Sequence, residues 1–222
     1  MVGVGAGLAR IGFTPFVHSF AVFLTRRSFD QIAMQVAYPK TNVKLVGFMP
    51  GIDSLLGVSH QAIDDIALMR ALPNMTVLEP AGPADYEDAV KAALAHHGPV
   101  YLRLYRANSH APNLSSFPPL GIGKIRQLSS GEDVVIFATG LMVEIALQAS
   151  KKLKKDSINA TVVDCASIKP LDVEGILKVV SECKIIVTAE NHTVVGGLGS
   201  AIADVIASNN IARPFFRIGV RD

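Results

Sequence analysis

The sequence predicts an α/β protein built from two consecutive doubly wound domains with mostly parallel sheets. Short β-rich runs alternate with amphipathic segments of helical length, which is typical of parallel strands covered by helices on both faces. Residues 107–123 interrupt this alternation with three prolines among serine, asparagine and glycine, and such a segment cannot build a ladder. A second alternating series follows. We therefore predict a first domain at 1–106, a linker at 107–123 and a second domain at 124–222.

The first domain is expected to begin with an apolar, glycine-rich helix. Residues 1–12 contain four glycines, which weaken an isolated helix but let its backbone approach a neighbour closely. We expect this helix to be tightly packed, at a subunit contact. The alternation then predicts strands at 14–18, 43–48, 76–79 and 100–104, and helices at 20–37, 60–72 and 84–96.

The predicted helix at 60–72 has clear signals at both ends. Gly57 frees the backbone before it, Ser59 is a plausible N-cap, and apolar residues recur at helical spacing until Pro73. His60 would then lie in the first helical turn, at the end of a glycine-containing loop. An isolated histidine in such a place is more often a capping residue on the surface than a catalytic one.

The second domain repeats the alternation from residue 124 onward. Its β-rich runs and amphipathic segments are again of the lengths that a parallel sheet with covering helices requires. The pattern predicts strands at 133–139, 159–165, 184–189 and 215–220, and helices at 143–153, 173–181 and 198–207.

The composition gives no sign of nucleic-acid or membrane binding. Half of the 222 residues are apolar, 18% are charged, and the net charge of +2 is too small to imply a nucleic-acid partner. The apolar N-terminal segment is too short to span a membrane and carries no basic leader. Cys165 and Cys183 do not have the spacing of a metal or disulfide motif, so a cytoplasmic location is expected.

Three long motifs resemble those of transketolases. The run Gly57-Val-Ser-His-Gln-Ala-Ile-Asp-Asp, followed by Ala67-Leu-Met-Arg-Ala-Leu-Pro-Asn-Met-Thr-Val, is similar to the thiamine diphosphate pyrimidine-binding domain. Val162-Val-Asp-Cys-Ala-Ser-Ile-Lys-Pro-Leu-Asp and Glu190-Asn-His-Thr-Val-Val-Gly-Gly-Leu-Gly-Ser resemble the transketolase C-terminal domain. The resemblance covers nearly the whole chain and is strongest to the small subunit of split transketolases.

This resemblance implies a thiamine diphosphate-dependent transferase that moves a two-carbon ketol unit between sugar phosphates. A beta subunit of a 2-oxoacid dehydrogenase, or an enzyme like deoxyxylulose-phosphate synthase, is the alternative with the same fold and cofactor. A non-catalytic binding or scaffolding remnant is an alternative of another class. Substrate turnover separates the first two, because ketol exchange and 2-oxoacid consumption are different reactions.

The resemblance assigns four residues of the first domain to the cofactor site. Phe20, Phe23 and Arg26 recur at a spacing of three, on one face of a helix. Such a face is usually core, but in the family aromatic residues at this place enclose the aminopyrimidine ring of thiamine diphosphate. Arg26 could also simply pair with a carboxylate. His60 is implied as the catalytic residue, through hydrogen bonding and proton transfer.

Two further positions are candidates for anion binding. Arg106 follows a predicted strand and matches a family arginine that binds sugar phosphate, although an ordinary salt bridge at the sheet edge is equally plausible. The glycine-rich turn 196–200 is not a dinucleotide fingerprint, so close helix packing accounts for it better than phosphate binding does. His192 beside it is expected to be structural.

The sequence also departs from the family pattern. No carboxylate precedes Asp30, so the family's catalytic glutamate is not in this chain, and we expect the N-terminal part of the first domain and the end of the second to be missing. Met49 replaces a substrate-binding histidine, and Leu56 stands near the place of an aspartate that contacts the donor hydroxyl. These changes put the usual ketose donors in doubt.

The remaining departure concerns the diphosphate end of the cofactor. Nothing in the sequence resembles the diphosphate-binding domain with its metal ligands, so no metal site is predicted in this chain. We expect Mg²⁺ to be held by a partner chain, a diphosphate-binding transketolase subunit, and we also expect self-association through apolar surfaces.

Overall fold

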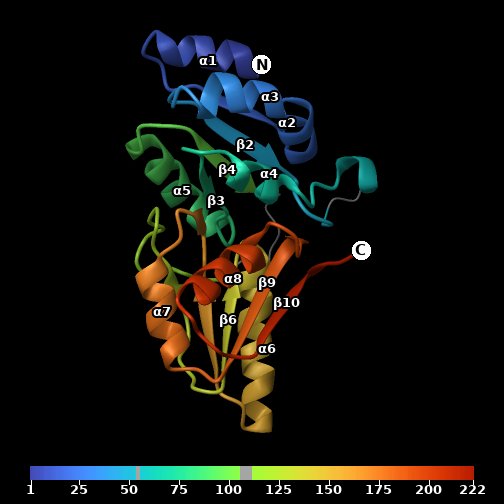
Figure 1. Ribbon diagram of the computed structural model, residues 1–222, viewed down its shortest axis with the longest axis vertical. Helices are drawn as coiled ribbons and strands as arrows, with labels where there is room; N and C mark the ends of the chain where they lie inside the picture. Colours follow the sequence, from blue (N-terminus) through green and yellow to red (C-terminus); the bar gives the residue numbers. More distant parts are fainter. Residues whose placement is uncertain (54–55, 106–111) are drawn as a thin grey trace.

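The computed structural model describes residues 1–53, 56–105 and 112–222. Within these residues the chain forms two α/β domains stacked end to end, each built on a mostly parallel five-stranded sheet (Figure 1). The predicted fold class is confirmed. None of the helices in the described ranges combines the length and the apolar character needed to cross a membrane.

The first sheet places the ends of its parallel strands along one edge. Its strand order is β1-β2-β4-β3-β8, and the first four strands are parallel. Phe20 is paired with Phe48, and Phe48 with Leu104, so the carboxyl ends of three strands lie in line. The strands are β1 (Phe16–Phe20), β2 (Lys44–Phe48), β3 (Thr76–Leu78), β4 (Val100–Leu104) and β8 (Ser167–Lys169).

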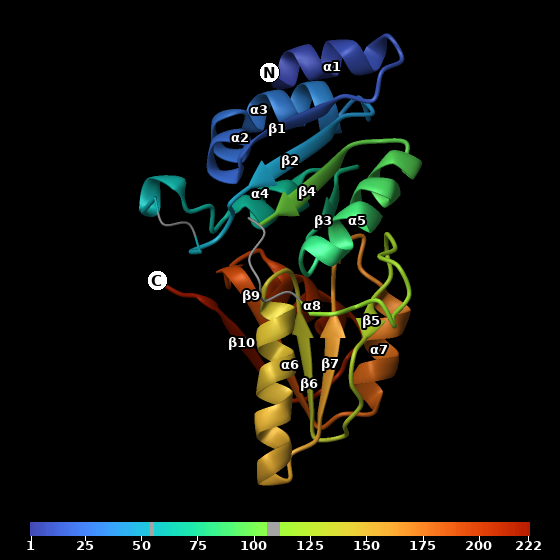
Figure 2. The same cartoon turned by 180° about the vertical axis from the view of Figure 1, so that it is seen from behind.

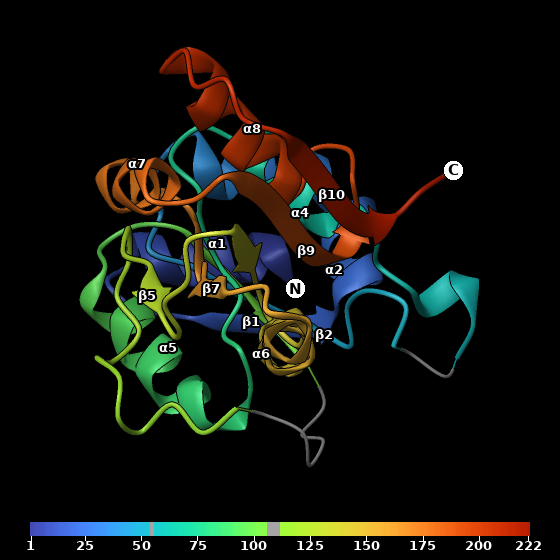
Figure 3. The same ribbon diagram turned by 90° about the horizontal axis from the view of Figure 1, so that it is seen from below.

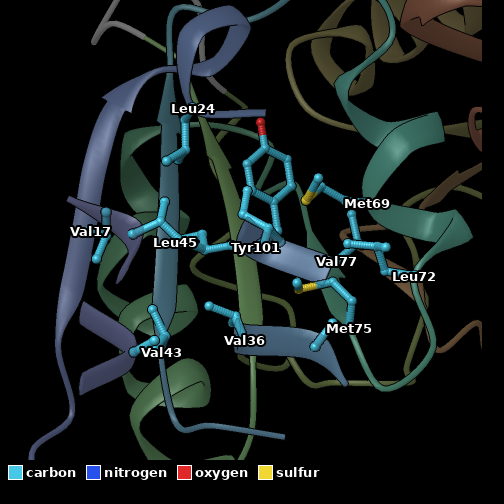
Figure 4. Close-up of a cluster of buried hydrophobic side chains, with 14 of the residues drawn as sticks. Val17, Leu24, Val36, Val43, Leu45, Met69, Leu72, Met75, Val77 and Tyr101 are labelled. Atoms are coloured by element: carbon cyan, nitrogen blue, oxygen red, sulfur yellow. The ribbon is translucent and has the colours of Figure 1, made fainter. Parts of the chain in front are cut away.

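Helices cover both faces of this sheet. One face is covered mainly by α1, η1 and α4, whose apolar side chains form the cluster drawn in Figure 4 with Leu45, Val77 and Tyr101 at its centre. The opposite face is covered by α5. The bounds are α1 (Val2–Arg10), α2 (Ala21–Arg27), α3 (Phe29–Gln31), the π-helix η1 (Ile32–Ala37), the 3₁₀ turn η2 (Val58–His60), α4 (Asp65–Ala71) and α5 (Pro83–Ala95).

The single helix predicted at 20–37 is divided into three consecutive pieces. Ser28 leaves helical geometry, with φ −110° and ψ 16°, and the last turns have π-type hydrogen bonds, such as Tyr38 N–H to the Ala33 carbonyl at 2.9 Å. Apolar periodicity identifies the helical path but not these local interruptions.

The second sheet has the order β10-β9-β6-β7-β5 and is parallel except for β5. Helix α6 packs on one face, whereas α7 and α8 pack on the other (Figures 2 and 3). The elements are β5 (Arg126–Gln127), β6 (Val134–Ala138), α6 (Met142–Leu153), η3 (Lys154–Asp156), β7 (Ala160–Asp164), α7 (Val173–Ser181), β9 (Ile185–Thr193), α8 (Leu198–Ser208) and β10 (Phe215–Val220).

Residues of the second domain extend into the first. Strand β8 pairs antiparallel with β3 and so adds a strand to the first sheet. The ammonium of Lys169, at the end of β8, donates to the carbonyls of Arg70 and Leu72 at 2.8 and 2.6 Å, at the C-terminus of α4. This ammonium satisfies carbonyls that the helix leaves free. The division at residues 107–123 is therefore crossed by backbone pairing as well as by side chains.

Candidate functional site

Three aromatic rings meet at the carboxyl edge of the first sheet. The ring centroids of Phe20 and Phe23 are 5.7 Å apart, and the His60 imidazole lies 5.4 Å from the first and 4.9 Å from the second. All three contacts are edge-to-face, and all three side chains are half-buried. The structure thus brings together three residues that the sequence analysis assigned to one site.

Local structure explains the placement of the two phenylalanines. Phe20 is the last residue of β1 and also precedes the first turn of α2, and Phe23 follows one turn later. Behind them, Ala21 and Val22 pack on Ala62 in a small buried cluster. The strand-to-helix turn therefore directs both rings away from the core, toward the segment that carries His60.

The helix predicted at 60–72 is present, but its predicted start at His60 is wrong. His60 ends the 3₁₀ turn η2, and α4 begins only at Asp65, with Asp64 rather than Ser59 at the N-cap. Residues 61–64 are held out of the helix by tertiary hydrogen bonds. The carbonyl of Ala62 accepts from Gly51 N–H at 2.7 Å, and that of Ile63 accepts from Thr193 N–H at 2.8 Å. Carbonyls bound in this way are not free to begin a helix.

His60 is instead held by contacts within its own turn. Its N–H donates to the carbonyl of Gly57 at 3.0 Å, and Gly57 has φ +75°, a conformation that favours glycine. The Ser59 hydroxyl lies 3.0 Å from His60 Nδ1. The serine expected to cap a helix therefore hydrogen-bonds the imidazole.

Arg26 makes the carboxylate pair that the sequence analysis left open. Its Nε donates to both oxygens of Asp64 at 2.9 and 3.0 Å, and both side chains are partly exposed. A neighbouring arginine, Arg27, lies over the Phe23 ring, 4.3 Å from its centroid. The assignment of Arg26 to the cofactor pocket stays a prediction.

Arg106 lies outside the described residues. The strand before it, β4, ends at Leu104 on the edge that also carries Phe20 and Phe48. Its role in phosphate binding stays a prediction.

A buried ionic network, which the sequence motifs did not predict, adjoins the ring cluster. Arg103 is fully buried and donates to both oxygens of Asp65 at 2.8 and 3.0 Å, and also to Glu79 and Tyr105. Burial raises the pKa of Asp65, but the charge and hydrogen bonds of Arg103 outweigh burial and hold it below its ordinary value. The one sequence signal was an arginine inside the otherwise apolar strand Val100–Leu104.

A second carboxylate explains the glycine-rich turn at 196–200. Glu190 accepts from the backbone N–H groups of Leu198 and Gly199 at 2.7 and 2.9 Å, at the N-terminus of α8. A Cβ at Gly197 would lie 1.9 Å from a Glu190 oxygen, so a larger residue there would displace the Glu190 carboxylate. The backbone N–H groups at this turn therefore bind an internal carboxylate, which the sequence analysis did not predict.

His192 is a structural histidine in this fold. Its Nε2 accepts from Ala67 N–H at 3.3 Å, and its Nδ1 lies 2.7 Å from the Thr193 carbonyl, where it acts as a donor. One accepting and one donating nitrogen describe a neutral imidazole. Burial and the positive charge of Arg103 lower its pKa accordingly.

Within residues 1–53, 56–105 and 112–222, no group of three or more histidine, cysteine, aspartate or glutamate side chains has the arrangement of a metal site. Both cysteines are buried free thiols.

Family models account for most of the chain. Residues 1–111 match the transketolase pyrimidine-binding domain, and residues 123–222 match the transketolase C-terminal domain.

Individual relatives agree with these matches. The chain is 44% identical to the 6-deoxy-6-sulfo-D-fructose transketolase subunit SqwH of Clostridium sp. (strain MSTE9), over 100% of this chain and 69% of that protein. It is 41% identical to a putative transketolase C-terminal section from Methanocaldococcus jannaschii, over 100% of this chain and 70% of that protein. A 1-deoxy-D-xylulose-5-phosphate synthase of Synechococcus sp. is 36% identical, over 100% and 34%. The chain thus spans about two thirds of the length of the transketolase relatives.

Solved structures show the same fold. A split gene transketolase, described as an inactive beta4 tetramer, superposes with a TM-score of 0.91 at 44% identity, over 99% of this chain and 71% of that one. The transketolase of Campylobacter jejuni superposes with a TM-score of 0.79 at 21% identity, over 100% of this chain and 33% of that one. The second likeness concerns the fold alone.

Proposed function

The chain belongs to the transketolase family, and we propose on that basis that it is a thiamine diphosphate-dependent transketolase subunit that moves a two-carbon ketol unit between sugar phosphates. The observation that carries the proposal is the cluster of Phe20, Phe23 and His60 at the carboxyl edge of a parallel sheet. This edge is where open α/β sheets bind ligands.

The residues of this cluster fit one end of the cofactor. Two phenyl rings offer apolar faces to a flat heteroaromatic ring, and stacking of this kind adds roughly 0.5–1.5 kcal/mol beyond the buried area. The imidazole of His60, set against both phenyl rings, supplies a nitrogen that can donate or accept a proton. The cofactor supplies the carbanion chemistry. In this proposal Phe20 and Phe23 orient the aminopyrimidine, and His60 moves a proton at the substrate oxygen.

The diphosphate end of the cofactor and its Mg²⁺ are assigned to a partner subunit. The two matching family models account for residues 1–111 and 123–222, and neither is a diphosphate-binding domain. The name of the SqwH relative describes a subunit, which supports a divided enzyme. We propose that this chain associates both with such a partner and with itself, in the cytoplasm, where free buried thiols are typical.

The donor sugar is proposed to differ from common ketose phosphates. Met49 and Leu56 lie in the loop that follows β2, and neither side chain can accept a hydrogen bond from a sugar hydroxyl in the way that histidine or aspartate can. The sugars in the names of two relatives, 6-deoxy-6-sulfo-D-fructose and apulose-4-phosphate, show how far substrates vary among similar chains.

The test is to purify the chain with and without its candidate partner, and to measure thiamine diphosphate binding by calorimetry and ketol transfer with a panel of sugar phosphates. We expect cofactor binding in the presence of Mg²⁺ and turnover only for the complex. Tight binding by the isolated chain would refute the divided site, and a complex that binds no cofactor would favour the non-catalytic remnant.

A synthase-like activity is the second candidate, because proteins named 1-deoxy-D-xylulose-5-phosphate synthase are 33–36% identical over 98–100% of this chain. The same complex separates the two candidates. Consumption of a 2-oxoacid without ketol exchange would favour the synthase.

A further inference from the structure

The loop that carries His60 is held by residues of the second domain. We call residues 49–61 the His60 loop; residues 54 and 55 of it are outside the described ranges. Its Ile52 N–H donates to the side-chain Oδ1 of Asn191 at 3.0 Å, and Asn191 belongs to β9. The loop is therefore fixed from across the domain junction by one side-chain oxygen.

Asn191 is itself fixed in place. The residue is 6% exposed, and its backbone carbonyl accepts from Arg103 at 3.0 Å. The same guanidinium donates to the carbonyl of Ala62 at 3.1 Å, just beyond the loop. Asn191 and the end of the loop therefore share a rigid, buried partner.

The backbone of the loop packs closely against the Asn191 side chain at Gly51. Gly51 has φ +71°, and a Cβ there would lie 2.2 Å from Asn191 Nδ2. This conformation and this contact both require glycine. The approach depends on the backbone of the loop and on the shape of the asparagine side chain.

The contact at Ile52 reaches His60 through one further residue. The carbonyl of Ile52 accepts from the side-chain amide of Gln61 at 3.2 Å, and Gln61 directly follows His60. Pro50 and Ala62 form an isolated parallel bridge that closes the base of the loop. Both sides of the loop are thus tied together at the point where Asn191 holds it.

We propose that Asn191 is a positioning residue, which keeps the His60 imidazole on the rings of Phe20 and Phe23 by accepting the hydrogen bond from Ile52. The expected effect on turnover rests on the proposed function. The expected effects on the loop and on the His60 ring do not depend on it. Among the described residues, the hydrogen bonds of Asn191 join it to Ile52 and Arg103 and not to His60. Its effect on turnover would therefore come from the placement of His60, and small displacements of a reacting group can cost about 10²-fold in rate.

The test compares three variants of one strand. Asn191→Leu fills the same space without an acceptor, and Asn191→Asp restores an oxygen at the position of Oδ1. Thr188→Val is the matched control, because Thr188 is also buried in β9 and its hydroxyl has no hydrogen-bond partner in the described part of the chain.

Two readouts do not require activity. The first is hydrogen exchange at Gly51 and Ile52, which we expect to be faster in Asn191→Leu by roughly tenfold. The second is the NMR signal of the His60 ring, one of six histidines, assigned through His60→Gln. We expect this signal to move toward that of an exposed histidine in Asn191→Leu and to keep its position in Asn191→Asp and Thr188→Val.

The third readout is turnover by the complex with its partner subunit. We expect Asn191→Leu to lower kcat by roughly tenfold or more with a smaller change in the KM for sugar, and Asn191→Asp to restore kcat. Unchanged exchange and an unmoved His60 signal in Asn191→Leu would overturn the proposal, as would a loosened loop with unchanged kcat. Failure of Asn191→Asp to restore either would also overturn it. A wild-type complex without activity would refute the proposed function instead, and exchange and NMR would still decide whether Asn191 holds the loop.

Discussion

The pH dependence of stability is expected to reveal the buried carboxyl of Glu190. This residue is 2% exposed, and burial raises the pKa of its carboxyl from 4.5 to about 7, although two backbone N–H groups of α8 act in the opposite direction. The perturbation is Glu190→Gln, which removes the titrating group and keeps one of its oxygens as an acceptor.

The sign follows from the direction of the pKa shift. A carboxyl whose pKa is higher in the folded than in the unfolded state binds a proton more tightly when folded, so its contribution to stability is full below pH 4.5 and is lost as the pH rises through about 7. The full difference between the folded and unfolded pKa corresponds to roughly 3 kcal/mol of stability. Between pH 5 and pH 8, the stability of the wild type relative to Glu190→Gln should therefore fall by about 2–3 kcal/mol.

The measurement is the free energy of unfolding in urea, for both proteins, at several pH values between 5 and 8. Glutamine loses one of the two hydrogen bonds to α8, which adds an offset of about 1–3 kcal/mol that does not depend on pH. Asp164, whose pKa burial raises to about 6, titrates in the same range but is present in both proteins and cancels. A difference between the two proteins that is constant with pH, or that grows as the pH rises, would refute the reasoning.

Three further substitutions test the domain junction and the ring cluster. Arg126→Met leaves Asp85 and Asp164 buried without a counter-ion, and it should lower the free energy of unfolding in urea by about 3–5 kcal/mol. Most of this loss should be recovered when both aspartates are also replaced by asparagine. A loss without that recovery would contradict the ionic explanation. Phe23→Ala should weaken thiamine diphosphate binding by the complex about tenfold in calorimetry, and equal affinity would remove Phe23 from the pocket. His60→Gln should lower kcat by about 10²–10⁴-fold with little change in cofactor affinity, and an unchanged kcat would exclude His60 as an acid or base.

The fold was largely predictable because its signals are local. Strand and helix lengths, glycine turns and apolar periodicity lie within short windows, and these gave both domains and nearly all of their elements. Strand β8 was missed because it has only three residues and forms by pairing with β3, which lies about ninety positions earlier in the chain. Such pairing leaves no local pattern.

The same distinction separates the predicted part of the site from the missed part. Phe20, Phe23 and His60 were assigned to one site through the resemblance, and their roles there stay a prediction. Their ring contacts follow from a strand-to-helix turn and a glycine-containing turn. The start of the helix predicted at 60–72 was wrong, although its end agrees with α4. Local spacing favoured a start at His60, whereas Gly51 and Thr193 bind the carbonyls of residues 62 and 63 from elsewhere in the fold. Tertiary hydrogen bonds determine where α4 begins, and helix propensity carries no information about such bonds.

The carboxyl ends of the two sheets face each other, and this arrangement explains where a ligand has room (Figure 2). Glu79 directly follows β3, and its carbonyl accepts from the Thr139 hydroxyl, which directly follows β6. An open sheet usually binds its ligand at this end. Here the shared space is filled by the chain's own buried ions, with Arg103 at their centre. The rings of Phe20, Phe23 and His60 remain half-buried at the carboxyl end of β1. Under the proposed function, a cofactor would reach these rings from outside the chain, and a partner subunit would hold its other end.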